Sequence, residues 1–337
     1  MNGDETVIVL GAGASRGVSY GRDSEFPSPL DYDFYDLLQR LNPSEADSRA
    51  VKRVLDRVNR LPRDYWRSFE RSFYTLQLKA YLSDKFGVDR PFETDDRIVT
   101  DFAFCVHALL RKAHGKTSKC DFHEAILSVL EPSDTVLSFN YDLVVERALK
   151  GIALRDSISF GQWIYGFGAS RTRRLPLILK LHGSSNWRFE SSDGNGLDRL
   201  HVRTKRWEDL DKAPGYTRIA TRDTTAFPIF LPFWDKRIEE KPWVNLWSSA
   251  LAQLSSAKNV LVWGYSLPPT DIKAYVLFDL GLSEREMNLC VVDPSPETRA
   301  RWRNFFPKAR YWEYELIDRL FVHPPDWLLL PVLRSQP

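Results

Sequence analysis

The chain has 337 residues, 43% hydrophobic and 27% charged, which suits one large globular domain or two modest ones. Its net charge of +2 gives no overall field that would favour nucleic acid or an anionic membrane, so we expect no direct binding to either. The three cysteines, Cys105, Cys120 and Cys290, form no CxxC pair, which excludes a four-thiolate zinc site and argues against a disulfide scaffold.

The first residues are polar and lead directly into an apolar run, which does not resemble a signal peptide. No apolar run reaches the length of a membrane span. We therefore expect a cytoplasmic protein.

The first predicted strand covers residues 6–10, and Gly11-Ala12-Gly13-Ala14-Ser15 follows it directly. A buried strand that leads into a glycine turn is typical of the start of a dinucleotide-binding unit. Glycine lets the backbone approach a pyrophosphate, and the following amides can donate to it. The strict GxGxxG spacing fails, because the third glycine, Gly17, comes one place late. On this stretch alone, a plain tight turn between strand and helix remains the alternative.

Residues 17–30 contain glycine, proline and charged residues and predict a loop, either a mobile cover for a ligand or a plain surface connection. Apolar residues at helical spacing then predict a large helical insertion over about 31–130. Its histidines, His107, His114 and His123, lack the spacing of a metal-ligand face and are expected to be structural or surface residues. The expected helices are 33–41, 46–61, 64–86, 96–114 and 121–130.

Strands and helices alternate after this block, which predicts an α/β protein with a Rossmann-like, doubly wound and mostly parallel sheet. The polar, turn-rich and cysteine-free stretch of about 187–227 predicts a small second insertion with hairpins, and 157–174 predicts strand and loop. We expect a single domain over 1–337. The expected strands are 135–139, 177–181, 259–263, 288–292 and 309–316, with an extended segment at 228–233, and the expected helices are 143–149, 242–257, 272–280 and 295–306.

Polar residues gather where the predicted strands end, whereas a random surface would scatter them over both ends. In open α/β sheets, ligands bind outside the carboxyl ends of the strands. The pattern therefore predicts one ligand site, with Asn140 near its centre. The residues are Gly13 and Ser15, Asn140 and Asp142, His182 and Ser184, Ser266, and Asp293.

Each of these residues also has a simpler interpretation. Asn140 could cap the helix that follows it, and a single histidine after a strand, such as His182, is more often structural than catalytic. Asp271 is most simply an N-terminal helix residue that the helix dipole favours. The coincidence of several such residues carries more weight than any one of them.

Four motifs resemble, in the same order, the signatures of the sirtuin-like NAD-binding fold. The resemblance is closer to the prokaryotic defence branch of that family than to the protein deacylases. It covers roughly 6–30 and 130–300 and leaves the helical block without a motif. The motifs are Gly11-Ala12-Gly13-Ala14-Ser15, Phe139-Asn140-Tyr141-Asp142, Lys180-Leu181-His182-Gly183-Ser184 and Gly264-Tyr265-Ser266-Leu267-Pro268, and the segment Pro232-Phe233-Trp234-Asp235-Lys236 is also typical of the defence branch.

Two departures from the deacylases argue against acyl-lysine chemistry. Their four-cysteine zinc module is replaced here by a cysteine-free stretch, so no metal is expected. Their Asp-Phe-Arg sequence after the glycine turn is also absent, and the nearest segment is Phe26-Pro27-Ser28-Pro29.

The resemblance implies that NAD is the substrate of an NAD+ glycohydrolase, with a reaction resembling glycoside hydrolysis at the nicotinamide–ribose bond. Asn140 would position the ribose and the attacking species, and His182 would act as the base, for which an imidazole is suited. Asp142 would bond to nicotinamide or steady the Asn140 loop. The implied binding residues are Gly11, Ala12, Gly13 and Ser15 for phosphate, Gly264 and Ser266 for phosphate or ribose, and Asp293 for the adenosine ribose.

For an enzyme of this branch, we expect depletion of NAD+ and abortive infection as an antiphage defence. The chain has no obvious sensor domain, so we expect a separate regulatory partner, and the resemblance to this branch also implies a homo-oligomer. A HerA-type ATPase is favoured over a short Argonaute because nothing in the sequence resembles an Argonaute-associated domain. The alternatives are a non-catalytic NAD or ADP-ribose sensor and an NAD-dependent protein deacylase.

Overall fold

A computed structural model describes residues 5–18, 25–41, 48–86, 95–115, 120–167, 174–190, 199–202, 205–210 and 243–331. Within them, six parallel strands form one sheet in the order β3-β2-β1-β6-β7-β8. This arrangement confirms the expected α/β, Rossmann-like architecture. The strands are β1 (Thr6–Leu10), β2 (Thr135–Ser138), β3 (Leu177–Lys180), β6 (Asn259–Trp263), β7 (Asn288–Val292) and β8 (Arg310–Tyr314).

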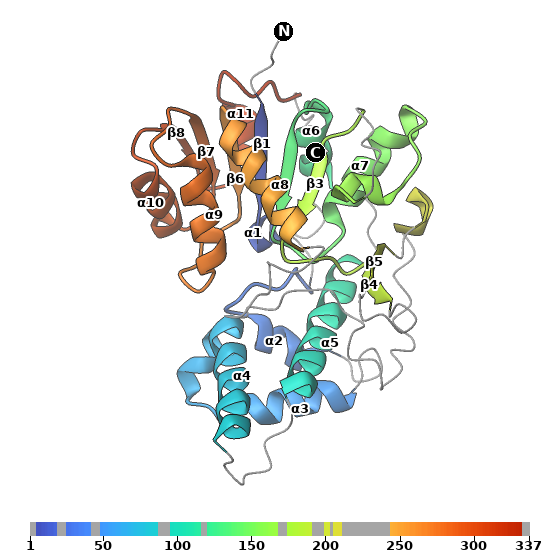
Figure 1. Ribbon diagram of the computed structural model, residues 1–337, viewed down its shortest axis with the longest axis vertical. Coiled ribbons are helices and arrows are strands. Elements are labelled where there is room, and N and C mark those ends of the chain that lie inside the picture. Colours follow the sequence, from blue (N-terminus) through green and yellow to red (C-terminus); the bar gives the residue numbers. More distant parts are fainter. Residues whose placement is uncertain are drawn as a thin grey trace.

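The inner strands are apolar on both faces, as expected for parallel strands that helices cover on both sides. All residues of β1, β2 and β6 are buried, as are those of the edge strand β3, whereas the other edge strand, β8, has no buried residue. Figure 1 shows the helices around the sheet, with α8 beside α9. The helices of this unit are α1 (Ala12–Arg16), α6 (Asp121–Ser128), α7 (Val144–Arg155), α8 (Trp243–Ser256), α9 (Ile272–Leu282), α10 (Pro296–Phe305) and α11 (Ile317–Val322).

The strand order reverses between β1 and β6, where the chain returns to the other side of β1 after building β2 and β3. At this point the backbones of two turns touch. The Gly11 amide donates to the Trp263 carbonyl at 3.1 Å, and the Gly13 amide donates to the Gly264 carbonyl at 2.9 Å. A Cβ atom on Gly11 or Gly13 would lie 2.4 Å or 2.7 Å from the Gly264 backbone. Gly11 and Gly13 must therefore be glycine because the turn after β1 packs directly against the turn after β6 at the expected ligand edge.

We expect Gly264→Ala to lower the free energy of unfolding by about 3 kcal/mol or more. Gly264 has φ +63°, and a Cβ atom there would lie 2.2 Å from the Ala14 nitrogen. The matched control is Gly166→Ala, where φ is +75° but the nearest atom is 3.5 Å away, so only backbone strain is added. Urea unfolding measures both variants, and equal losses would show that the close contact contributes nothing.

The buried hydrophobic side chains form two separate cores. The first surrounds the sheet. The second lies within the helical insertion, which Figure 1 shows beyond the carboxyl end of β1. Within the second core, the Asp101 carboxylate binds Arg53 at 2.5 Å and Arg57 at 2.7 Å, which ties α3 to α5. Its elements are α2 (Phe34–Gln39), α3 (Ser48–Val58), the 3₁₀ helix η2 (Arg63–Arg67), α4 (Phe69–Lys85) and α5 (Asp95–His114).

The structure differs from the sequence-based expectations at several places. The expected helix 64–86 is divided at Ser68, which is extended and separates η2 from α4. The described part of 157–174 contains the 3₁₀ helix η3 (Gln162–Tyr165) where a strand was expected. The helix α11 was not expected. A hairpin does occur in the second insertion, where β4 (Trp187–Glu190) pairs antiparallel with β5 (Arg199–Val202) before the 3₁₀ helix η4 (Trp207–Leu210).

The predicted extended segment 228–233 and the Pro232–Lys236 motif lie outside the described residues. In the part of the chain that is described, no helix combines the length and apolarity needed to cross a membrane.

Candidate functional site

The turns after β1 and β2 are joined by a buried polar cluster of Ser15, Asn140 and Asp142. The Asn140 side-chain amide donates to the Ser15 hydroxyl at 2.9 Å and to the Gly11 carbonyl at 2.8 Å. The Ser15 hydroxyl in turn donates to Asp142 Oδ2 at 2.5 Å. These bonds fix the orientation of the Asn140 amide, because its NH₂ group faces two acceptors and its carbonyl oxygen must therefore point elsewhere.

Asp142 also holds the start of α7, since its Oδ1 accepts the Val144 amide at 3.0 Å. Burial acts to raise the pKa of this carboxyl, but nearby His114 and Lys180 and the bonds from Ser15 and Val144 outweigh it and hold the pKa below its usual range. Asp142 is thus an ionised acceptor that organises the Asn140 turn. This geometry supports the expected steadying role.

A chain of buried polar groups lies behind this turn. Lys180, the last residue of β3, donates to the Asp142 carbonyl and pairs with Glu146 of α7 at 3.2 Å. The Tyr165 hydroxyl donates to the same carboxylate at 2.9 Å, and the Asn186 amide donates to Tyr165 at 3.1 Å. Lys180 and Glu146 have side chains only 1% and 0% exposed, so this ion pair is held entirely inside the protein.

His182 follows β3 and is held by a carboxylate from a distant part of the chain. Its Nε2 lies 3.0 Å from Oδ2 of Asp271, and the same oxygen accepts the Tyr265 hydroxyl at 3.0 Å. Asp271 is the N-cap residue of α9, but its side chain makes no capping bond to the helix. The sequence-based interpretation placed Asp271 correctly at a helix start, and the structure adds its contact with His182.

A carboxylate on Nε2 has a chemical consequence for the ring. In the neutral imidazole that donates from Nε2, Nδ1 is the acceptor. The ring is 12% exposed, and the Phe139 ring meets it edge-on at a centroid distance of 5.0 Å. Phe139 itself stacks on Tyr265 at 4.0 Å. The imidazole is therefore oriented by both a carboxylate and an aromatic wall, which is the arrangement that a general base requires.

The register of β2 and β3 brings Asn140 and His182 to the same edge. Ser138 pairs with Lys180, so Asn140 and His182 both come two residues after a matched pair. The residues on either side of Asn140, Phe139 and Tyr141, both have rings near the His182 ring. The two residues expected to be catalytic thus follow adjacent strands at the same end of the sheet.

The helical insertion reaches this edge through Ser28, His114 and Asp33. Arg16 of α1 pairs with Asp33 at 2.8 Å and donates to the Ser28 carbonyl at 2.6 Å. His114 Nε2 lies 3.1 Å from the Ser28 hydroxyl, and burial lowers the pKa of this histidine. Tyr141 packs against the second core, and burial raises its pKa well above the usual value.

His107, His114 and His123 are all buried, so none of them is a surface residue. His123 contacts the Cys120 thiol at 3.1 Å and lies against the Trp263 ring at 4.3 Å, as expected for a structural histidine. Among the described residues, no group of three or more His, Cys, Asp or Glu side chains is arranged to hold a metal ion.

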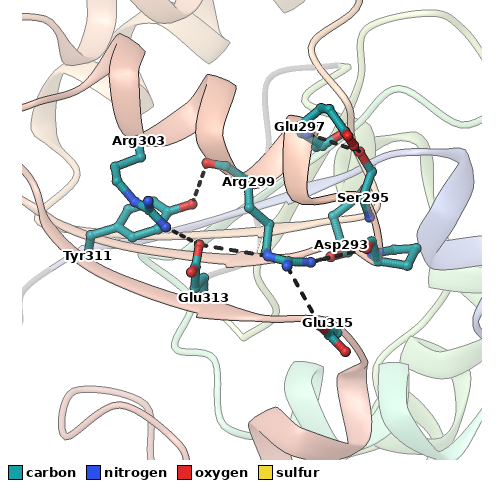
Figure 2. Close-up of polar contacts among 10 residues, drawn as sticks. Asp293, Ser295, Glu297, Arg299, Arg303, Tyr311, Glu313 and Glu315 are labelled. Atoms are coloured by element: carbon teal, nitrogen blue, oxygen red, sulfur yellow. Dashed lines mark hydrogen bonds and ion pairs between the residues drawn. The ribbon is translucent and has the colours of Figure 1, made fainter.

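Asp293 directly follows β7 and lies in a charged cluster at the start of α10 (Figure 2). Its carboxylate accepts the Ser295 amide at 2.9 Å, and burial raises its pKa. Arg299 donates to the Asp293 carbonyl at 2.6 Å and lies 3.7 Å from Glu313 and 3.8 Å from Glu315. This acid is thus fixed three strands away from Asn140 at the same end of the sheet.

The remaining expected ligand residues lie in the turns that follow β1 and β6. Ala12 is exposed at the first position of α1, and Ser266 is exposed after β6. The Ser266 carbonyl accepts from Arg301 at 2.5 Å. The Gly11 and Gly13 amides are already donating to the β6 turn, so phosphate contacts through these glycines stay a prediction.

Sequence reasoning missed Asp271 as the partner of His182, and Lys180 and Glu146 as the support of Asp142. The only local signal for Asp271 was its place at a helix start. The apolar residues around Lys180 predicted a strand and gave no sign that its ammonium is buried beside Glu146.

A scan against family models matches no family, and a search of curated proteins finds no match. The structural neighbours are Sir2 enzymes. A structure on the mechanism and regulation of Sir2 enzymes has 14% identity and a TM-score of 0.36, covering 94% of this chain and 91% of that chain. Sir2 with the inhibitor EX-527, 2'-O-acetyl-ADP-ribose and deacetylated p53 peptide has 14% identity and a TM-score of 0.39, covering 94% and 93%. Sir2Tm bound to a propionylated peptide has 13% identity and a TM-score of 0.38, covering 94% and 92%.

Proposed function

We propose that this protein is an NAD+ glycohydrolase that cleaves the nicotinamide–ribose bond. The observation that carries the proposal is the His182–Asp271 contact, with His182 and Asn140 at the same end of the adjacent strands β3 and β2. Asn140 and His182 lie on the β1 side of the strand-order reversal, and Asp271 reaches them from the β6 side; Rossmann-like sheets bind nucleotides at such a reversal. The motif resemblance to sirtuin-like defence proteins supplies NAD as the substrate.

The groups match the steps of the reaction. The bond between ribose C1' and the nicotinamide nitrogen breaks, and its electron pair returns to the pyridine ring, which leaves as neutral nicotinamide. An oxocarbenium-like C1' is then attacked by water on the opposite face. His182 takes the proton of that water, and Asp271 stabilises the imidazolium that results. The fixed Asn140 amide directs its oxygen toward the ribose or the water, because its NH₂ group is already bonded.

The other expected residues take supporting roles in this proposal. Ser15 and Asp142 keep the Asn140 amide in one orientation. Ala12, at the exposed N-terminus of α1, and Ser266 are placed to approach phosphate or ribose. Asp293, whose pKa is raised by burial, offers its carboxyl to the adenosine ribose hydroxyls.

The test is to incubate the purified protein with NAD+ and to separate the products by chromatography. We expect nicotinamide and ADP-ribose in equal amounts. Asn140→Ala and His182→Ala should each lower the rate by roughly 10²- to 10⁴-fold, the usual contribution of a positioned acid–base group. The matched control is His323→Ala, an exposed histidine that follows α11, which should keep the full rate.

Two other outcomes would favour the alternatives. If NAD+ binds in calorimetry but is not consumed, alone or with any partner, the protein is a sensor of NAD or ADP-ribose. If nicotinamide release requires an acetyl-lysine peptide and yields the deacetylated peptide, the protein is a deacylase.

In the cell, this activity would deplete NAD+ and abort phage infection. The resemblance to the defence branch suggests regulation by a separate protein. A HerA-type ATPase is the favoured partner and a short Argonaute the second choice. Reconstitution with each, followed by the same product assay, distinguishes them, because only the true partner should change the rate of NAD+ loss.

A further inference from the structure

Lys180 contacts both of the turns that carry the expected catalytic residues. Its backbone closes the turn that holds His182, because the Lys180 carbonyl accepts the Gly183 amide at 3.0 Å. Its side chain reaches the turn that holds Asn140, because the ammonium donates to the Asp142 carbonyl. One residue is therefore bonded to a position directly after His182 and to a position two residues after Asn140.

A second hydrogen bond joins the same two turns. The Ser185 amide donates to the Tyr141 carbonyl at 2.8 Å. The successive carbonyls of Tyr141 and Asp142 thus both accept from the segment around His182. The Ser185 donor is a backbone amide that side-chain substitutions leave in place, whereas the Lys180 donor is a side chain and can be removed alone.

Stability alone does not account for a lysine at this position. The Lys180 and Glu146 side chains are 1% and 0% exposed and lie 3.2 Å apart. Replacement of a buried ion pair by apolar residues of similar volume is often neutral or stabilising, because two charges no longer have to leave water. Apolar residues cannot, however, donate to the Asp142 carbonyl. The Glu146 carboxylate, which also accepts the Tyr165 hydroxyl at 2.9 Å, keeps the ammonium beside that carbonyl.

We propose that Lys180 is a positioning residue that sets the distance between the Asn140 amide and the His182 imidazole. This role rests on the proposed function, because the distance matters only if both side chains act on one substrate. Without the ammonium, the Asp142 carbonyl loses a donor and the Asn140 turn can shift relative to His182. The Ser15–Asp142 bond that helps to orient the Asn140 amide shifts with it. A misplacement of about 1 Å can cost roughly 10²-fold in rate.

A double variant separates positioning from stability. Lys180→Met/Glu146→Leu removes both buried charges together, so it should recover much of the wild-type resistance to urea, but it lacks the donor to the Asp142 carbonyl. We expect kcat for nicotinamide release from NAD+ to fall by roughly 10- to 10²-fold, with KM changed by less than about threefold. A second variant, Lys180→Met/Glu146→Gln, keeps an acceptor for the Tyr165 hydroxyl and should show the same loss of kcat.

Leu320→Ala controls for a loss of stability. Leu320 is 0% exposed in α11, which packs against β8 at the other edge of the sheet, so its truncation leaves a cavity far along the sheet from β3. At a temperature where this variant is folded, we expect the wild-type kcat. A loss of kcat equal to that of the two double variants would mean that destabilisation alone explains their effect, and the positioning role would be wrong.

The orientation of Asn140 has a readout that does not depend on hydrolysis. Its side-chain amide donates to the Gly11 carbonyl and the Ser15 hydroxyl, so its protons are shielded from exchange with water. Nitrogen-15 NMR of protein labelled at asparagine follows this amide, once Asn140→Ala has assigned its signal. We expect the exchange rate without NAD+ to rise by roughly tenfold or more in both double variants.

Two results would overturn the role of Lys180. One is the wild-type kcat in a folded double variant, and the other is an Asn140 amide that exchanges at the wild-type rate in both double variants. If the wild type itself does not consume NAD+, the proposed function fails, and the exchange rate alone decides whether Lys180 fixes the Asn140 turn. Faster exchange then supports this role, and unchanged exchange excludes it.

Discussion

Asp271→Asn is expected to lower kcat for the proposed NAD+ hydrolysis by roughly 10²- to 10⁴-fold while changing KM much less. The carboxylate accepts from His182 Nε2 at 3.0 Å, and an asparagine of the same shape can present its NH₂ group there instead. That change would favour the tautomer with the proton on Nδ1, which removes the acceptor that the base needs. Asp271 does not itself touch the substrate in this mechanism, so it is a positioning residue.

Two controls isolate this effect. Tyr265→Phe removes the other bond to the same carboxylate, and we expect a loss of no more than about tenfold because the His182 contact remains. Nitrogen NMR of the six histidines reports the tautomer of His182 directly, once His182→Ala has assigned its signal. A normal kcat in Asp271→Asn, or a tautomer that does not change, would show that the dyad has no catalytic part.

Lys180→Met is expected to lower the free energy of unfolding by about 3–5 kcal/mol, since it leaves a buried carboxylate without its cation. Glu146 is 0% exposed and Lys180 is 1% exposed, and they lie 3.2 Å apart. The same substitution removes the ammonium that donates to the Asp142 carbonyl. The Asn140 turn should therefore loosen along with the fold.

The double variant Lys180→Met/Glu146→Leu should recover much of this loss, because it removes both buried charges together. An exposed pair gives the comparison. Lys308 and Glu284 have side chains 54% and 82% exposed, so Lys308→Met should cost less than about 1 kcal/mol. Chemical denaturation measures all three variants. Similar losses of unfolding free energy in Lys180→Met and Lys308→Met would mean that burial of the Lys180–Glu146 pair does not affect stability.

The strands could be predicted closely from the sequence because they are short apolar runs with polar ends. The predicted bounds of the first strand and of 259–263 and 288–292 are those of β1, β6 and β7. The parallel direction of the strands also followed from the alternation of strands and helices. Local pattern was less informative where structure depends on distant packing, as in the 3₁₀ turn of 162–165 where a strand was expected.

The sequence also pointed to the edge of the sheet at which Asn140, Asp142 and His182 gather. It could not supply the partners of these residues, since spacing carries no information on contacts between distant segments. His182 and Asp271 are on different elements, and Asp271 resembles any acidic residue at a helix start. Lys180 ends an apolar run, and its burial depends on the ion pair with Glu146 of α7. Such pairs become visible only when the chain is folded.

The division into two cores affects how the candidate site can meet solvent. Asn140 and His182 belong to the sheet unit. At the same edge, His114 of the helical insertion contacts Ser28, and Tyr141 packs against the second core. Polar bridges join the units, such as Arg16 with Asp33 and Thr270 with Glu70. Parting the two units would therefore exchange these bridges for water and would also uncover the side of Tyr141 that packs against the second core.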